Sequence, residues 1–217
     1  MQEIILSGLN RLYGLKPVIG NPNAKIDKNG MHFTITTYEV TGLGHLSVID
    51  MKAMLGLMKM ESVVLNAETK DLPLFSADYI RAAGKNTLLV EFYDTMVEPL
   101  AKEPAAVYRR VKEKYKDLPP YSSGPHWYDS IRYDFTFGAS DSSLKEKADK
   151  ITADYFDAYL ENIAVAPGAD PILKREKTQA YVNGLFQNGG PAVDQFKKLI
   201  GEEAAREVFE KYVFCCR

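Results

Sequence analysis

The sequence has no stretch of 18 consecutive apolar residues, so it contains no candidate transmembrane helix. Its first residues lack a basic leader and a small-residue cleavage site, and we expect no secretory signal. The only cysteines, Cys215 and Cys216, are adjacent. Neighbours rarely bridge each other, and two ligands do not make a metal site. These absences predict a cytoplasmic protein with no metal site and no membrane partner.

The motifs of common nucleotide-binding and hydrolytic enzymes are also missing. There is no phosphate loop, no G-x-G-x-x-G, no G-x-S-x-G and no H-E-x-x-H. The net charge of −2 gives no global sign of nucleic-acid binding, and we expect no such partner. The residues that are present, 46% hydrophobic and 26% charged, are ordinary for a globular protein that buries a sizeable core.

Residues 31–94 alternate between apolar and polar side chains, with many β-branched and aromatic residues. Short breaks divide this stretch. Strands joined by so few residues must be antiparallel neighbours, because a parallel return needs a dozen residues or more. The pattern predicts a meander of five strands, at 31–40, 45–53, 57–65, 72–80 and 86–94.

Helical periodicity occurs on both sides of that meander. A short helix is expected over 2–14, and the 3.6-residue period of 99–115 predicts an amphipathic helix. Residues 131–137 alternate again and predict a sixth strand, after which about 143–214 is helical. This order of elements predicts one α+β domain over 1–217, with helices packed on a single antiparallel sheet.

Asp78 and Glu61 stand out among the acids of the meander. Parity places Asp78 on a face with Leu74 and Ile80, and Glu61 on a face with Val63. Both faces are mainly apolar and the two strands are adjacent, so the acids could meet across the ladder. Burial raises the pKa of a carboxyl group by up to ~3–5 units, which makes it a proton donor near pH 7. The alternative is a solvated sheet face, on which an acid is ordinary.

Several longer stretches carry a further signal. They are ESVVLNAETKDLPLFSAD (61–78), the following NTLLVEFYDTMVEP and, nearer the C-terminus, YFDAYLENI, QAYVNGLFQN and FKKLIGEEAAREVFEKYVF. Together they resemble the ferredoxin-dependent bilin reductases, over about 40–214. The resemblance implies a three-layer α/β/α sandwich that binds a linear tetrapyrrole, such as biliverdin, between the sheet and the C-terminal helices. It also implies electrons from reduced ferredoxin or flavodoxin, without a bound cofactor.

The resemblance implies catalytic roles for three residues. The family's central catalytic Asp falls on Asp78. A second proton-relay position, a His in one branch of the family, falls on Glu61, which can exchange a proton but cannot become a cation. An Asn or Asp from the loop between late helices falls on Asn188.

The substrate-binding residues match the family less closely. An acid from an earlier strand falls near Asp50, with the register off by one. A basic residue for the bilin propionates is expected where Gly189 and Gly190 stand. Its absence leaves Arg132 and Lys52 as candidates for that role.

Three functions therefore remain open from the sequence. The first is reduction of a linear tetrapyrrole, with protons from side chains. The second is a non-catalytic tetrapyrrole-binding protein of the same fold. The third is an interaction protein with an unused pocket.

Overall fold

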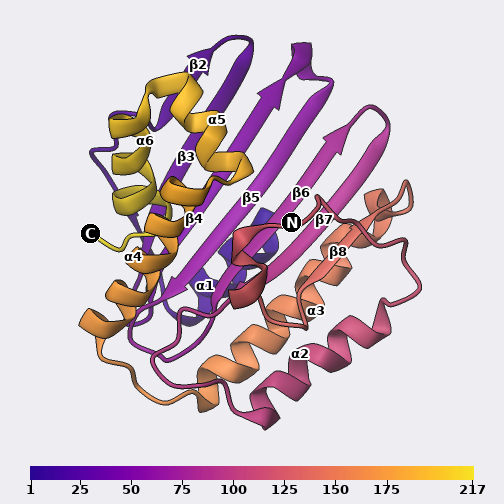
Figure 1. Cartoon of the computed structure of the whole chain (residues 1–217). Helices are drawn as coiled ribbons and strands as arrows, with labels where there is room; N and C mark the ends of the chain where they lie inside the picture. Colours follow the sequence, from indigo (N-terminus) through magenta and orange to yellow (C-terminus); the bar gives the residue numbers. More distant parts are fainter.

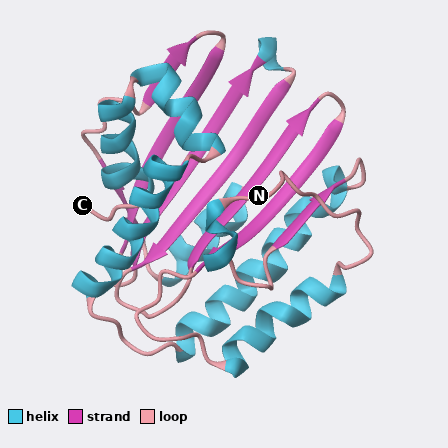
Figure 2. Cartoon of the chain, viewed as in Figure 1, coloured by secondary structure: helices cyan, strands magenta, loops and turns pink.

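The computed structural model describes residues 1–217, with one antiparallel sheet between two layers of helices (Figure 1). Seven strands follow the spatial order β1-β3-β4-β5-β6-β7-β8, and β2 also pairs with β3 (Figure 2). The α+β sandwich predicted from the sequence is confirmed. The strands are β1 Leu15–Val18, β2 Lys25–Lys28, β3 Met31–Val40, β4 Gly44–Ala53, β5 Met58–Ala67, β6 Leu74–Ala82, β7 Lys85–Tyr93 and β8 Phe137–Ser140.

Strands β3 to β7 are the predicted five-stranded meander. Strands β1 and β2 were not predicted, because four residues each are too short to show a period. The predicted strand over 131–137 is wrong. The 3₁₀ turn Trp127–Ile131 ends where that strand was expected to begin, residues 132–136 form a loop, and β8 begins only at Phe137. The alternation had another cause, since Tyr133 and Phe135 stack on each other within a loop.

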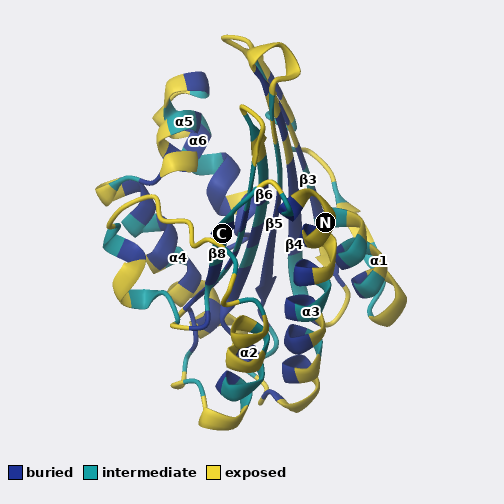
Figure 3. Cartoon of the chain, turned by 90° about the vertical axis from the view of Figure 1, so that its right-hand side faces the viewer, coloured by how far each residue is buried: buried dark blue, intermediate teal, exposed yellow.

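The helices divide between the two faces of the sheet (Figure 3). Helices α1 (Gln2–Leu12), α2 (Lys102–Lys114) and α3 (Leu144–Val165) cover one face. Helices α4 (Pro171–Asn188), α5 (Pro191–Ile200) and α6 (Glu202–Val208) cover the other, and a π-helical turn, Phe209–Val213, extends α6. No helix is both long enough and apolar enough to cross a membrane.

Strand alternation creates two separate hydrophobic cores. On the α3 side, the buried ring of Phe92 lies 5.4 Å from Phe75 and 4.5 Å from Tyr108. On the α4 side, Phe196 packs edge-on against Phe33 with a centroid distance of 4.9 Å. Burying one such ring stabilises the fold by roughly 1.5–3 kcal/mol. Each strand residue therefore faces one layer of helices or the other, and its parity decides which.

Gly44, at the start of β4, is a position where a side chain does not fit. A Cβ atom there would lie 2.1 Å from the backbone oxygen of Asn66. We expect Gly44→Ala to lower the free energy of unfolding by more than ~2 kcal/mol, because a backbone group cannot give way cheaply. Gly42→Ala is the matched control. Its φ of +75° is also unfavourable for alanine, but no atom lies within 4 Å, so about 1 kcal/mol is expected. Urea unfolding of both variants measures the difference, and equal losses would contradict the steric explanation.

Candidate functional site between the sheet and the C-terminal helices

Asp78 lies near the middle of the sheet, on the face that α4 to α6 cover. It pairs with Ser62 on β5 and with Leu89 on β7. Because alternate residues share a face, Asp78 lies on the side of buried Leu74 and Tyr93 rather than on the α3 side. Its side chain is half-buried. The apolar face predicted for Asp78 from the sequence is therefore the face of the second core.

The surroundings of Asp78 favour its neutral form. Burial raises the pKa of its carboxyl group to about 7, and the nearby charge of Glu91 adds to the increase. A hydrogen bond with the Ser62 side chain acts in the opposite direction, but it is the smaller effect. Near neutral pH, Asp78 is thus a mixture of acid and carboxylate. A carboxyl group in this state can donate a proton and take one back.

Three tyrosines line this face of the sheet beside the two acids. Tyr93 stacks on Tyr181 of α4 with a centroid distance of 4.8 Å, and meets Tyr128 edge-on at 5.7 Å. Burial raises the pKa of all three phenols, and the charges of Glu91 and Asp78 contribute for Tyr128 and Tyr181. The tyrosines therefore remain protonated at neutral pH. They offer hydroxyl donors together with flat apolar surfaces.

Glu91 and Arg132 form the charged part of the site. The Tyr93 hydroxyl donates to Glu91 over 2.9 Å, and the Arg132 guanidinium donates to the other oxygen of Glu91 over 3.0 Å. Arg132 also pairs with Asp129 at 2.7 Å. The predicted substrate-binding Arg132 therefore lies on the same face as Asp78, and the one cation in this group is already bound by two carboxylates.

The loop that carries Tyr128 and Arg132 is fixed to α4 by Trp127. The Trp127 indole nitrogen donates to the backbone oxygen of Gly189 over 2.9 Å. Its ring lies so close to Gly184 that a Cβ atom there would be 2.2 Å from it. Gly184 thus allows a close approach that no other residue permits. This contact joins the loop to the helix that carries Tyr181.

Two of the predicted site residues lie on the opposite face. The expected meeting of Glu61 with Asp78 is wrong, because Ser62 is the partner of Asp78 and Glu61 pairs with Tyr79. Glu61 forms an ion pair with Arg81 at 2.9 Å on the α1 and α3 side. Asp50 pairs with Glu61 across β4 and β5, shares its face and is exposed. A register shifted by one residue turns every side chain to the other face, and parity within one strand does not reveal it.

Asn188 ends α4 and is also exposed. Its side-chain nitrogen donates to the backbone oxygen of Gly184 over 3.2 Å, as a helix-ending residue does. No contact joins it to Asp78. Of the three residues predicted to be catalytic, the structure places only Asp78 among the tyrosines.

The residues that sequence reasoning missed are Ser62 and the three tyrosines. Ser62 is identified as the partner of Asp78 by the β5–β6 register, which the sequence alone does not reveal. Tyr93 and Glu91 share a parity within β7, which places both on one face of the sheet. Tyr128 lies in a loop and Tyr181 in a helix, so no local pattern connects them with Asp78.

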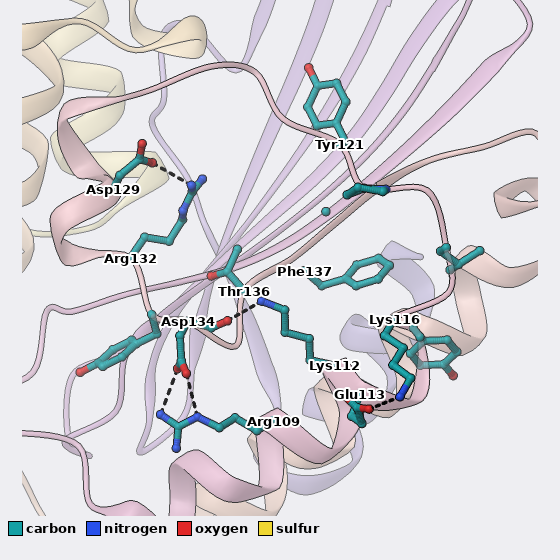
Figure 4. Close-up of a pocket in the computed structure, with 15 residues that line it drawn as sticks. Arg109, Lys112, Glu113, Lys116, Tyr121, Asp129, Arg132, Asp134, Thr136 and Phe137 are labelled. Carbon is teal, nitrogen blue, oxygen red and sulfur yellow. Dashed lines mark hydrogen bonds and ion pairs between the residues drawn. The ribbon is translucent and has the colours of Figure 1, made fainter.

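A separate surface groove of about 710 Å³ lies between α2, β8 and the loop before β8 (Figure 4). All but one of its cations are paired with a carboxylate. The fork of Arg109 holds both carboxylate oxygens of Asp134, Lys112 donates to the Asp134 backbone oxygen, and Arg132 pairs with Asp129. Asp78 does not line this groove, and the two regions share Arg132.

The raised pKa of Asp78 predicts a stability that depends on pH. Its ordinary value is 3.8 and its folded value about 7, so the folded state binds more protons between these two values. Stability from this residue is therefore complete below about pH 4 and is lost as the pH rises through about 7. We expect Asp78→Asn to be more stable than the wild type at about pH 8, by at most roughly 4 kcal/mol, and not at about pH 4. Urea unfolding at both values tests this, with exposed Asp50→Asn as the control. The opposite trend would contradict a raised pKa.

No protein-family model and no curated protein matches the sequence. Among solved structures, the chain is similar to phytochromobilin synthase from tomato, crystallised in complex with biliverdin, with a TM-score of 0.77. The match covers 99% of this chain and 82% of that chain, at 16% sequence identity. Such an identity shows the fold alone. The resemblance found in the sequence is therefore confirmed at that level: this chain has the fold of a ferredoxin-dependent bilin reductase, from which its sequence is distant.

Proposed function

We propose that this protein binds a linear tetrapyrrole between the sheet and helices α4 to α6, and reduces it. The observation that carries the proposal is Asp78, a half-buried carboxyl group with a pKa near 7 on that face of the sheet. The fold supports it, because the tomato protein with this fold was crystallised with biliverdin.

The proposed reaction needs both electrons and protons. Reduction of one double bond takes up two electrons and two protons. The electrons would come singly from two molecules of reduced ferredoxin or flavodoxin. Asp78 would donate one proton to the pigment and regain it from solvent, and water would supply the other. A pKa near the working pH suits such a donor, because both protonation states are then populated.

The neighbours of Asp78 would bind the pigment. The rings of Tyr93, Tyr128 and Tyr181 present flat apolar surfaces that suit a conjugated ligand. Arg132 could bind a propionate, but only by exchanging Glu91 or Asp129 for it. Such an exchange contributes less binding free energy than an unpaired arginine would, because an existing ion pair must be broken. We therefore expect the propionates to contribute little to affinity.

A non-catalytic tetrapyrrole-binding protein is the second candidate. The observation that favours it is that Glu61 and Asn188, the other two residues expected to be catalytic, lie away from Asp78. Under this alternative the pigment binds and is not reduced.

The first test is binding and reduction of biliverdin by the purified chain. We expect biliverdin absorption to shift on binding, because the site changes the pigment's conformation and surroundings. Addition of reduced ferredoxin should then change the spectrum of the bound pigment. A shift without later change would support the second candidate, and an unchanged biliverdin spectrum would contradict both.

The second test separates proton donation from binding. We expect Asp78→Asn to keep the spectral shift and to lower the reduction rate by ~10²–10⁴-fold, because asparagine cannot donate that proton. Glu61→Gln is the control and should reduce at the wild-type rate, since its side chain is on the other face. In the wild type, the rate should fall as the pH rises above about 7 and Asp78 becomes charged. Equal rates for wild type and Asp78→Asn would rule out Asp78 as the donor.

A further inference from the structure

Three hairpin turns lie side by side at one end of the sheet. They join β2 to β3, β4 to β5 and β6 to β7, and the ladder pairs place them at the same end (Figure 2). The turn residues are exposed, and the tips of the sheet are coloured accordingly in Figure 3. Neither the fold nor the proposed site gives this end a role.

The central turn, between β4 and β5, carries three large aliphatic side chains in water. The exposed fractions are 66% for Met54, 105% for Leu55 and 73% for Leu57. Single exposed apolar residues are normal on protein surfaces, but three within four residues at the tip of a projecting hairpin form a protrusion. The turn is convex, so its side chains project away from the rest of the chain.

The backbone of this turn is also costly. Met54 has φ of 52° and Leu55 has φ of 55°, in the left-handed region that residues with a Cβ atom avoid. Glycine or asparagine would adopt it more easily, as Gly56 does next to them. The turn thus keeps large apolar side chains where small or polar ones would fit better. Strain of this kind is characteristic of functional segments.

Cations surround the protrusion. Lys52 and Lys59 are direct cross-strand partners, and Lys59 also pairs with Arg81 on β6. Like charges in such positions repel each other. Arg81 is held by Glu61, whereas Lys52 and Lys59 have no acidic partner.

The three turns together carry a strongly positive net charge, whereas the whole chain is slightly acidic. Segments 27–32, 52–59 and 81–86 carry five lysine or arginine side chains and one aspartate, a net charge of +4. The whole chain has a net charge of −2. Positive charge is therefore concentrated at the end of the sheet where the apolar side chains project.

We propose that this end of the sheet attaches the protein to an anionic lipid membrane. Met54, Leu55 and Leu57 enter the apolar layer beneath the headgroups, while Lys52 and Lys59 contact the acidic headgroups. Such a contact lies on the surface of the bilayer and needs no spanning helix. The sequence-based expectation of no membrane partner rested on spanning segments alone.

Two other occupants fit the observations less well. A second copy of the chain would bring two ends of charge +4 together, and three side chains are too few for the ~1,200 Å² that a stable interface buries. An acidic protein would match the charge, but a convex apolar tip needs a matching hole in a folded partner. A fluid lipid layer accommodates such a tip without one.

Flotation of the full chain with lipid vesicles tests the proposal. We expect binding to vesicles of phosphatidylcholine with phosphatidylserine, and at least tenfold weaker binding to phosphatidylcholine alone. The double variant Leu55→Ser and Leu57→Ser should lower binding to the anionic vesicles at least tenfold. Val165→Ser is the matched control, because Val165 is 71% exposed but lies at the end of α3, and its binding should be unchanged.

Lys59→Glu separates a membrane role from a structural one. In the free protein it replaces a repulsion with attraction to Lys52 and Arg81, so the thermal midpoint should rise or stay the same. Binding to anionic vesicles should nevertheless fall at least tenfold. Replacing a residue with only a structural role would not lower vesicle binding while the thermal midpoint is kept or raised.

Three results would overturn the proposal. The first is no binding to anionic vesicles. The second is binding that the serine double variant leaves intact. The third is concentration-dependent self-association in sedimentation velocity that the double variant abolishes, which would make the tip an interface between copies. Biliverdin binding should be the same in the double variant and the wild type, so this test is independent of the proposed function.

Discussion

The buried ammonium group of Lys174 fixes the helix on which the candidate site depends. It donates to the backbone oxygens of Leu72 and Thr95 over 2.7 and 2.9 Å, and lies 3.8 Å from the Asp71 carboxylate. Asp71 in turn accepts from the backbone of Val97 and Glu98 over 2.9 Å each.

Burial lowers the pKa of Lys174 to about 8, and the charge of Asp71 opposes that decrease. One side chain from the first turn of α4 therefore ties the loops after β5 and β7 to this helix. Its loss would leave two carbonyl oxygens buried without this donor and the Asp71 carboxylate buried without a countercharge, which costs far more than the pair contributes.

With α4 attached in this way, the fold can accommodate Asp78, a residue on the same face of the sheet that destabilises the folded state. Asp78 opposes folding at neutral pH, because a partly charged carboxyl group is held where burial and Glu91 disfavour its charge. The tyrosines beside it cannot supply the missing countercharge, and Arg132 is engaged by Glu91 and Asp129. A protein selected for stability alone would place an apolar residue there. The attached helix covers the face on which Asp78 lies and limits its contact with water, so the pKa of this acid stays high, as a proton donor requires.

Much of the fold could be predicted from the sequence, and the site only in part. The meander and the C-terminal helices follow from their periods, which are local, and the apolar side of β6 follows from Leu74 and Ile80. The partner of Asp78 depends on the β5–β6 register instead. Ser62 and Glu61 are adjacent in sequence and both fit a two-residue period, so only the pairing decides which of them faces Asp78. Tyr128 lies in a loop and Tyr181 in a helix. Both are so far from Asp78 in the sequence that no local pattern connects them with it. The strand predicted over 131–137 was wrong for a related reason, because the aromatic residues of this loop alternate without forming a strand.

Strand β6 connects the two proposals, and its length keeps them compatible. The strand ends at Ala82, beside the basic hairpin turns, and Asp78 lies four residues before that end. At a rise of ~3.3 Å per residue, this separates Asp78 from the end of the strand by about 13 Å. The headgroup region on one side of a bilayer is only about 5–8 Å thick. A chain anchored by Leu55 at the hairpin tip would therefore hold Asp78 in the aqueous phase, within reach of a water-soluble electron donor. The pKa of Asp78 is raised by burial within the protein and by the charge of Glu91. Attachment to a membrane at the hairpin tip would therefore not change this pKa.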